Sequence, residues 1–137
     1  MNTETRRQVR ERASHRCEYC LLPQSAAPFF TFHIEHIVAT QHVQDDSLDN
    51  LCLACPHCNL HKGPNLTTIN PVSRELIPLF HPRKQKWQDH FTVEDARVEG
   101  LSETGEATAR LLKMNDADQV EIRARLIFRG EFELPAS

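Results

Sequence analysis

The chain has 137 residues, of which 39% are hydrophobic and 26% charged, and this composition excludes a disordered tail and predicts a single domain spanning residues 1–137. No apolar run approaches the ~18 residues needed to cross a bilayer, so no membrane association is expected. Residues 1–16 are polar and Arg-rich, without the apolar centre of a secretory signal, and the chain is therefore predicted to be cytoplasmic.

Charge is unevenly distributed along the sequence. The net charge of -3 is unusual for a protein that binds nucleic acid, because such proteins usually present a basic surface. Residues 1–20, however, hold five Arg against three Glu, and residues 58–90 hold five basic against two acidic side chains, whereas residues 91–121 hold eight acidic against three basic ones. A basic surface is therefore still expected from the first two segments. Trp87 lies among basic residues, as aromatic side chains do on protein surfaces that bind nucleic acid, although Trp is more often a core residue.

The first predicted element is an amino-terminal helix. Residues 3–15 contain neither Gly nor Pro and favour a helix with Thr3 as its cap. Its apolar stripe is narrow, because only Val9 and Ala13 have the i,i+4 spacing of one helix face. Residues 17–28 then read as a tight turn followed by a loop that contains two prolines.

A strand and a short helix are predicted next. Residues 29–38 alternate apolar and polar side chains, as a half-buried strand requires, with an apolar face of Phe30, Phe32 and Ile34. Residues 39–51 are polar and Asp-rich, and are predicted to be a connecting loop or a weak second strand. Pro56 suits the first position of a helix, and Gly63 with Pro64 ends it after about two turns. A helix this short is not stable by itself, and a bound metal ion is the candidate for stabilising it.

The extension over residues 66–137 is predicted to be mostly helical. Prolines divide residues 64–86 into short pieces, of which one fits a buried strand: Leu76, Ile77, Leu79 and Phe80. Residues 102–114 and 116–128 both favour helices. The second has Asp116 as its cap, and its apolar face is formed by Val120, Ala124 and Ile127. Three roles stay open for this extension: shaping a DNA groove, forming a dimer, or completing the core.

The five cysteines carry the most specific spacing. In a reducing compartment, paired cysteines indicate metal rather than disulfides. Two Cys-x-x-Cys pairs offer four thiolates to a structural zinc ion: Cys17 with Cys20, and Cys55 with Cys58. Cys52 with Cys55 is a competing pair. The 55/58 pair is preferred because Pro56 places it at a helix start, which leaves Cys52 as a small buried hydrophobic residue.

A Glu-His pair offers the chemistry of phosphodiester hydrolysis. That reaction needs a base to activate water and a cation to stabilise the departing oxygen. Glu35 and His36 are adjacent at the end of the predicted strand, so their side chains diverge, which suits attack and departure on opposite sides of phosphorus. The imidazole of His36 is a candidate general base, and Glu35 offers oxygen to a divalent ion. His33, on the same strand face as Glu35, could orient that carboxylate or share the ion.

Three motifs together resemble the HNH endonuclease family over about residues 10–65: Phe32-His-Ile-Glu-His-Ile, Asn50-Leu, and Cys55-Pro-His-Cys-Asn-Leu-His-Lys-Gly. The resemblance implies a ββα-metal fold with a structural zinc ion held by four cysteines. It also implies roles for five residues: His36 as general base, Glu35 and Asn59 as ligands of the catalytic metal, Asn50 as the residue that fixes the loop behind His36, and Lys62 as a candidate phosphate contact.

Asn59 shapes the expected metal preference. The corresponding position of that family is often His, and an amide oxygen in its place leaves an all-oxygen ligand set. Such a set favours Mg²⁺ or Mn²⁺ over Ni²⁺ or Zn²⁺. His61 is a rival ligand, but on a helix it lies about 200° round from Asn59 and is expected to face away.

The sequence therefore predicts an α+β chain with an Arg-rich entry helix, a ββα-metal core at about residues 10–65 and a mostly helical extension. The leading functional hypothesis is a metal-dependent endonuclease that cuts double-stranded DNA. The alternatives are a non-catalytic, zinc-stabilised module that binds nucleic acid or protein, and a purely structural domain. The oligomeric state stays open, because no interface is evident in the sequence.

Overall fold

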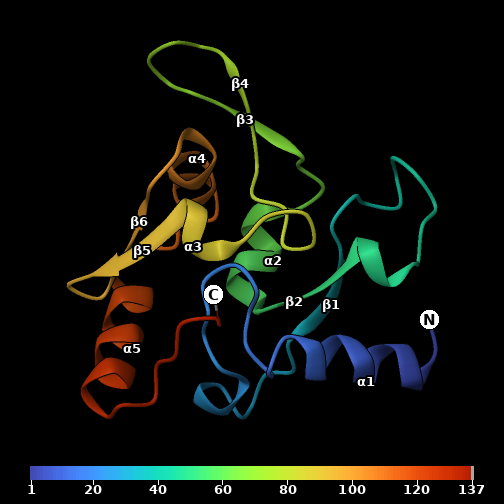
Figure 1. Ribbon diagram of the computed structural model, residues 1–137, viewed down its shortest axis with the longest axis horizontal. Coiled ribbons are helices and arrows are strands. Elements are labelled where there is room, and N and C mark those ends of the chain that lie inside the picture. Colours follow the sequence, from blue (N-terminus) through green and yellow to red (C-terminus); the bar gives the residue numbers. More distant parts are fainter. Residues whose placement is uncertain (137) are drawn as a thin grey trace.

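The computed structural model describes residues 1–136 and confirms the predicted α+β class (Figure 1). The helices are α1 (Thr3–Arg12), α2 (Pro56–Lys62), α3 (Trp87–His90), α4 (Glu103–Leu111) and α5 (Ala117–Phe128), with 3-10 turns at Gln24–Ala26 and Leu48–Asn50. The strands form three antiparallel hairpins: β1 (His33–His36) with β2 (Leu51–Ala54), β3 (Thr67–Ile69) with β4 (Leu76–Pro78), and β5 (Phe91–Glu94) with β6 (Arg97–Gly100).

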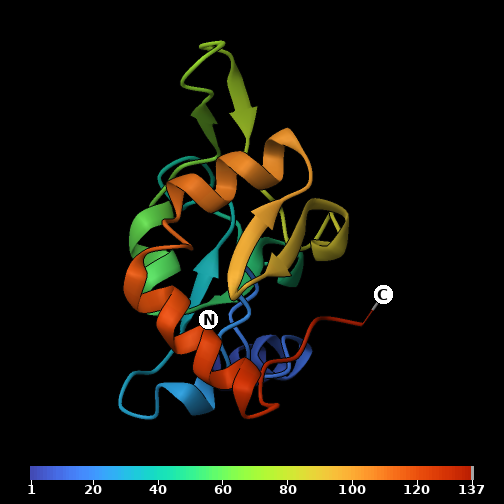
Figure 2. The ribbon, with the colours of Figure 1, turned by 90° about the vertical axis from the view of Figure 1, so that its left-hand side faces the viewer.

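The β1–β2 hairpin and α2 lie between α1 and the carboxyl-terminal elements (Figures 1 and 2). The hairpin β3–β4 projects from the body of the molecule. The carboxyl-terminal tail packs back against the body of the molecule, where Arg16 donates to the carbonyl of Glu133 and Gln88 of α3 donates to the carbonyl of Pro135. Within residues 1–136 no helix is long and apolar enough to cross a membrane.

The ββα unit forms where the sequence predicts its helix. In the β1–β2 register, Glu35 lies opposite Cys52 and His36 opposite Leu51. Helix α2 follows β2 after a single residue, with Pro at its start and Gly63 at its end. Gly63 has a φ of 53°, a region that residues with a side chain rarely adopt, so this glycine ends the helix at low cost. The prediction of a two-turn helix is confirmed.

The amino-terminal elements are shorter than predicted. Asn2, rather than Thr3, caps α1, since its side chain accepts a hydrogen bond from the backbone N–H of Thr5 at 2.8 Å. The helix ends at Arg12 because Ser14 and His15 have positive φ. Strand β1 has four residues, set by the length of its partner β2.

The predicted apolar face of the first strand is wrong in part. Phe30 is 64% exposed and lies before β1, while Phe32 is buried. The side chain of Gln24 holds this segment as a loop, because its amide donates to the carbonyl of Phe30 and its oxygen accepts from the N–H of Phe32. Within β1 the most buried side chain is that of Glu35.

The extension contains the two predicted helices, α4 and α5, and also two hairpins that the sequence did not predict as such. The predicted apolar face of α5 is wrong: Ala124 and Ile127 are exposed, and the buried residues are Arg123 and Leu126. Arg123 is buried because its guanidinium donates to the carbonyls of Ala96 at 2.7 Å and of Met114 at 2.9 Å.

One cluster of buried side chains joins the ββα unit to the extension. From the first half of the chain it includes Val9, Tyr19, Phe32, Leu51 and Leu53, and from the second half Phe80, Trp87, Phe91, Leu112 and Met114. The indole N–H of Trp87 donates to the carbonyl of Tyr19 at 2.7 Å, which makes Trp87 a core residue rather than a nucleic-acid contact. The extension therefore completes the core, one of the three roles that the sequence left open.

Candidate active site and metal centre

Four cysteines gather into a buried cluster that suits a metal ion. Their sulfur atoms lie within 4.8 Å of one another and belong to Cys17, Cys20, Cys55 and Cys58, which together form the four-cysteine cluster. The Sγ atoms of Cys20 and Cys55 are 3.7 Å apart. Tetrahedral zinc with Zn–S bonds of ~2.3 Å separates its sulfur ligands by about 3.8 Å, whereas a disulfide requires about 2.05 Å. The spacing therefore fits four thiolates around one ion.

Backbone hydrogen bonds hold both cysteine pairs in place. Glu18, inside the first pair, donates its N–H to the carbonyl of Leu53 at 2.9 Å, and its carboxylate accepts the N–H of Leu53 at 2.7 Å. The second pair begins α2, where the Sγ of Cys55 accepts from the N–H of Cys58 at 3.4 Å. Strand β2 and the start of α2 thus bring together pairs that are far apart in the sequence.

Electrostatics also favour a cation among these thiols. Hydrogen bonds from the thiol of Cys17, and from those of Cys55 and Cys58, lower the pKa of Cys20. Hydrogen bonds with Cys17, Cys20 and Cys55, together with burial, raise the pKa of Cys58 well above its usual value. One thiolate is therefore stabilised by its neighbours, but further ionisation is opposed until a positive charge enters the cluster.

Cys52 lies outside this cluster, whereas Cys55 and Cys58 both lie in it. Its buried thiol is 3.7 Å from the hydroxyl of Tyr19 and 3.7 Å from the carboxylate of Glu35. Cys52 is therefore a buried neighbour of the Glu35 carboxylate, a role that its sequence spacing did not suggest.

A second candidate centre is a shallow depression of about 320 Å³ over β1 and the end of α2. Its lining includes four of the residues singled out in the sequence: His33, Glu35, His36 and Asn59. His61 does not line the depression. Glu35 can offer a carboxylate oxygen and Asn59 an amide oxygen to a cation here. Within residues 1–136, His33, Glu35 and His36 do not form a compact three-ligand group.

Glu35 is a largely buried carboxylate, with 8% of its surface exposed. Burial raises its pKa to about 7, and the ammonium of Lys62, 3.6 Å away, opposes that rise. Near neutral pH this carboxyl group is therefore poised between its two protonation states. A divalent cation at Glu35 would favour the ionised state.

Lys62 differs from the expectation of a phosphate contact. It is 2% exposed, and its ammonium donates to the carbonyl of Ile37 at 3.0 Å. The buried carboxylate of Glu35 draws the ammonium inward, because each charge would be costly to bury alone. Lys62 therefore contacts Glu35 and the backbone behind the depression rather than solvent.

Asp46 is a neighbour of His36 that the sequence did not reveal. One of its carboxylate oxygens lies 2.6 Å from Nε2 of His36. A carboxylate accepts the Nε2–H, which leaves the lone pair of the imidazole on Nδ1. In the sequence, Asp46 is one of several acidic residues of a polar loop, and no spacing distinguishes it from the others.

Asn50 connects the end of β1 to the loop that follows it. Its side-chain oxygen accepts the N–H of Val38 at 2.9 Å, and its amide donates to the carbonyls of Val38 and Asp45 at 3.1 and 2.9 Å. The backbone carbonyl of Asn50 also accepts the N–H of Ile37 at 2.8 Å. With 5% of its surface exposed, Asn50 holds the ends of the loop that contains Asp46.

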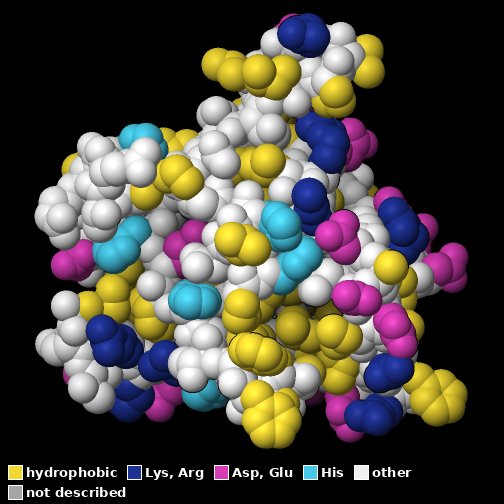
Figure 3. All heavy atoms as spheres, turned by 180° about the vertical axis from the view of Figure 1, so that it is seen from behind, with side chains coloured by type: hydrophobic (Ala, Val, Ile, Leu, Met, Phe, Trp, Pro, Cys, Tyr) yellow, Lys and Arg dark blue, Asp and Glu magenta, His cyan; other side chains and the backbone are white. Residues whose placement is uncertain are grey.

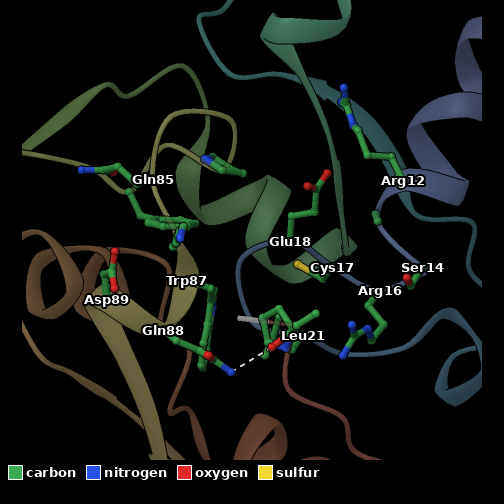
Figure 4. Close-up of a pocket in the computed structure, with 16 residues that line it drawn as sticks. Arg12, Ser14, Arg16, Cys17, Glu18, Leu21, Gln85, Trp87, Gln88 and Asp89 are labelled. Atoms are coloured by element: carbon green, nitrogen blue, oxygen red, sulfur yellow. Dashed lines mark hydrogen bonds between the residues drawn. The ribbon is translucent and has the colours of Figure 1, made fainter.

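A larger hollow, of about 480 Å³, lies elsewhere, between the end of α1, the first cysteine pair and α3 (Figure 4). Residues such as Arg12, Glu18, Trp87 and Asp89 line it, and Glu35, His36, Asn50 and Asn59 do not. The tail closes one side through the bond from Gln88 to Pro135. It is a junction between parts of the fold, and its lining offers no His-centred chemistry.

The basic surface is smaller than the sequence suggests. On α1, Arg7 pairs with Glu4 and Glu11, and Arg12 donates to the carbonyls of Leu48 and Leu51. Farther along the chain, Arg83 pairs with Glu18. On the face seen in Figure 3, Lys and Arg side chains are scattered in small groups among apolar, acidic and histidine side chains and do not form one continuous patch.

Comparison with known families supports the resemblance seen in the sequence. Residues 17–65 match the model of the HNH endonuclease family. This segment contains both cysteine pairs, the β1–β2 hairpin, α2 and the depression's Glu35, His36 and Asn59. No curated protein and no solved structure matched the chain.

Proposed function

We propose that this chain, through its HNH segment, is a metal-dependent endonuclease that hydrolyses phosphodiester bonds in double-stranded DNA. The observation that carries the proposal is the grouping of Glu35, His36 and Asn59 around one depression beside the four-cysteine cluster. The depression is shallow rather than enclosed, which suits a polymer backbone better than a small molecule. The family match supports a nucleic acid as the substrate.

In this mechanism His36 takes a proton from the attacking water. The contact with Asp46 holds the Nε2–H, so Nδ1 is the nitrogen that accepts the proton, and Asp46 stabilises the imidazolium that forms. Asp46 is thus a positioning residue, and Asn50 keeps its loop against β1. Glu35 and Asn59 would hold a divalent ion, which supplies positive charge for the departing oxygen.

The four-cysteine cluster would hold the structural ion, for which zinc is the best candidate, because four thiolates are its usual structural ligand set. Its role is to fix α2 against the knuckle at residues 17–20. Since α2 also carries Asn59, the structural ion positions one ligand of the proposed catalytic ion. The chain's own thiolates perform no step in the hydrolysis.

Cleavage of supercoiled plasmid DNA tests the proposal directly. With zinc-loaded protein, we expect nicked or linear product in the presence of Mg²⁺ or Mn²⁺, and much less with Ni²⁺ or added Zn²⁺, because carboxylate and amide oxygens favour hard cations. Product would be measured by gel electrophoresis across these metals. No cleavage of DNA or RNA with any of them would favour the alternative of a non-catalytic binding module.

Lys62→Met should move the activity to higher pH. Removing the ammonium withdraws the positive group that lowers the pKa of Glu35, so this pKa rises further above 7. An opposite charge this close typically alters the ionised fraction tenfold or more, and the variant should therefore lose about tenfold of its cleavage rate at about pH 7 and recover at about pH 9. The measurement is the rate of plasmid cleavage from about pH 6 to about pH 9.5.

Lys84→Met is the matched control, because Lys84 is a lysine outside the depression. Its pH profile should follow that of the wild type. A Lys62→Met variant that folds, as judged by circular dichroism, and keeps the wild-type pH profile would contradict the proposed part of Glu35 in metal binding.

A further inference from the structure

Three potential ligands gather at a place that belongs neither to the four-cysteine cluster nor to the depression. They are His57 and His61 of α2 and Asp116, the residue that precedes α5, and their ligand atoms lie within 4.8 Å of one another. The i,i+4 spacing places both imidazoles on one face of α2, with ring centroids 4.5 Å apart. The carboxylate comes from the extension, on the other side of the junction with α2.

The hydrogen bonds around these side chains suit metal binding. The Nε2 of His57 lies 2.8 Å from the carbonyl of Lys113, which can only accept, so Nε2 carries the proton and Nδ1 keeps its lone pair. Histidines that bind metal usually donate their other ring N–H to such a carbonyl. Asp116 stands at the amino-terminal cap of α5, but its carboxylate makes no capping bond with the helix. Its oxygens therefore stay available.

We propose that His57, His61 and Asp116 form a second transition-metal site, which joins α2 to the extension. Two imidazole nitrogens and one carboxylate oxygen suit Zn²⁺ or Ni²⁺ and disfavour Mg²⁺, so this site and the depression select different cations. Three protein ligands leave at least one position for water. The inference does not depend on the proposed nuclease activity, because none of its residues lines the depression.

A bound ion would act on the packing of the extension. Helix α2 carries Cys58 and Asn59, while the segment from Lys113 to Asp116 leads from α4 into α5. An ion bound by His57 and His61 of α2 and by Asp116 of the extension would link these two parts, in addition to the hydrogen bond between His57 and Lys113. An ion that binds the folded state alone would raise the temperature of unfolding, and the rise would grow with the logarithm of the ion concentration above the dissociation constant.

Calorimetric titration of the full chain with Ni²⁺ tests the site, with the four-cysteine cluster loaded with zinc beforehand. Glu35→Gln in all proteins would remove the carboxylate of the depression as a competing ligand. In this background we expect one binding event, which His61→Ala and Asp116→Asn should weaken by at least about 10- to 100-fold. Asp118→Asn is the matched control, because Asp118 is an exposed carboxylate in the first turn of the same helix. It should bind as the background protein does.

The midpoint of thermal unfolding gives a second readout. Ni²⁺ should raise it in the background protein and in Asp118→Asn, and the same Ni²⁺ concentration should raise it much less in Asp116→Asn. Circular dichroism without Ni²⁺ would show that the variants are folded. Equal Ni²⁺ affinity in the background protein, His61→Ala and Asp116→Asn would overturn the proposal, as would the absence of any binding event in the background protein.

Discussion

His36→Ala is expected to lower the rate of DNA cleavage by about 10²- to 10⁴-fold while the protein remains folded. The physical reason is that alanine cannot accept the proton of the attacking water. The carboxylate of Asp46, now without its imidazole partner, is half exposed and regains solvent contact at little cost. Single-turnover cleavage of a plasmid with Mg²⁺ measures the loss.

His33→Ala is the matched control, because His33 lies on the same strand and lines the same depression. This variant should lose less than about tenfold of the cleavage rate. Among residues 1–136 the imidazole of His33 has no hydrogen-bond partner, whereas that of His36 has Asp46. Thermal unfolding followed by circular dichroism would establish that both variants fold. A folded His36→Ala protein with wild-type activity would sink the assignment of His36 as the base.

Loss of the structural metal is expected to abolish cooperative folding. Structural zinc sites contribute roughly 10–16 kcal/mol, which is comparable to or larger than the ~5–15 kcal/mol by which a typical domain is stable. The four-cysteine cluster lies in the buried core between the ββα unit and α5, so its loss exposes both sides of that junction. Cys58→Ser should therefore show no cooperative thermal transition, and a chelator should have the same effect on the wild type.

Cys52→Ala provides the control for a buried cysteine outside the cluster. This variant should hold as many zinc ions per chain as the wild type, as measured by native mass spectrometry, and should unfold cooperatively. Adding Zn²⁺ back to chelated wild-type protein should restore the transition. A stable Cys58→Ser protein that binds no zinc would show that hydrophobic packing alone maintains this core.

Local sequence signals predicted the elements whose causes are local. The proline at the start of α2 and the glycine at its end act within a few residues. The cysteine pairs were predictable for another reason: metal coordination restricts which spacings are useful. The segment with these signals is also the one that matches the HNH family.

Other features depend on partners far away in the chain. The buried face of α5 follows from Arg123, whose guanidinium needs the carbonyl of Ala96 from the turn of the β5–β6 hairpin. An apolar pattern cannot reveal this, because it assigns an arginine to the solvent side. Asp46 was similarly hidden, since it resembles the other acidic residues of its loop until its neighbour His36 is known. Asp116 was predicted only as a helix cap, and its place beside two histidines depends on the packing of α5 against α2.

The amino-acid sequence by itself determined the ββα segment, the four clustered cysteines and the candidate residues Glu35, His36, Asn50 and Asn59, because short-range spacing encodes them. Only the tertiary structure decided how deeply those side chains are buried and which side chains lie beside them. Burial raises the pKa of Glu35 and turns Lys62 inward, and folding places a carboxylate at His36. Desolvation and long-range contacts exist only in the packed chain, and they control the charge and the tautomer of the proposed reacting groups.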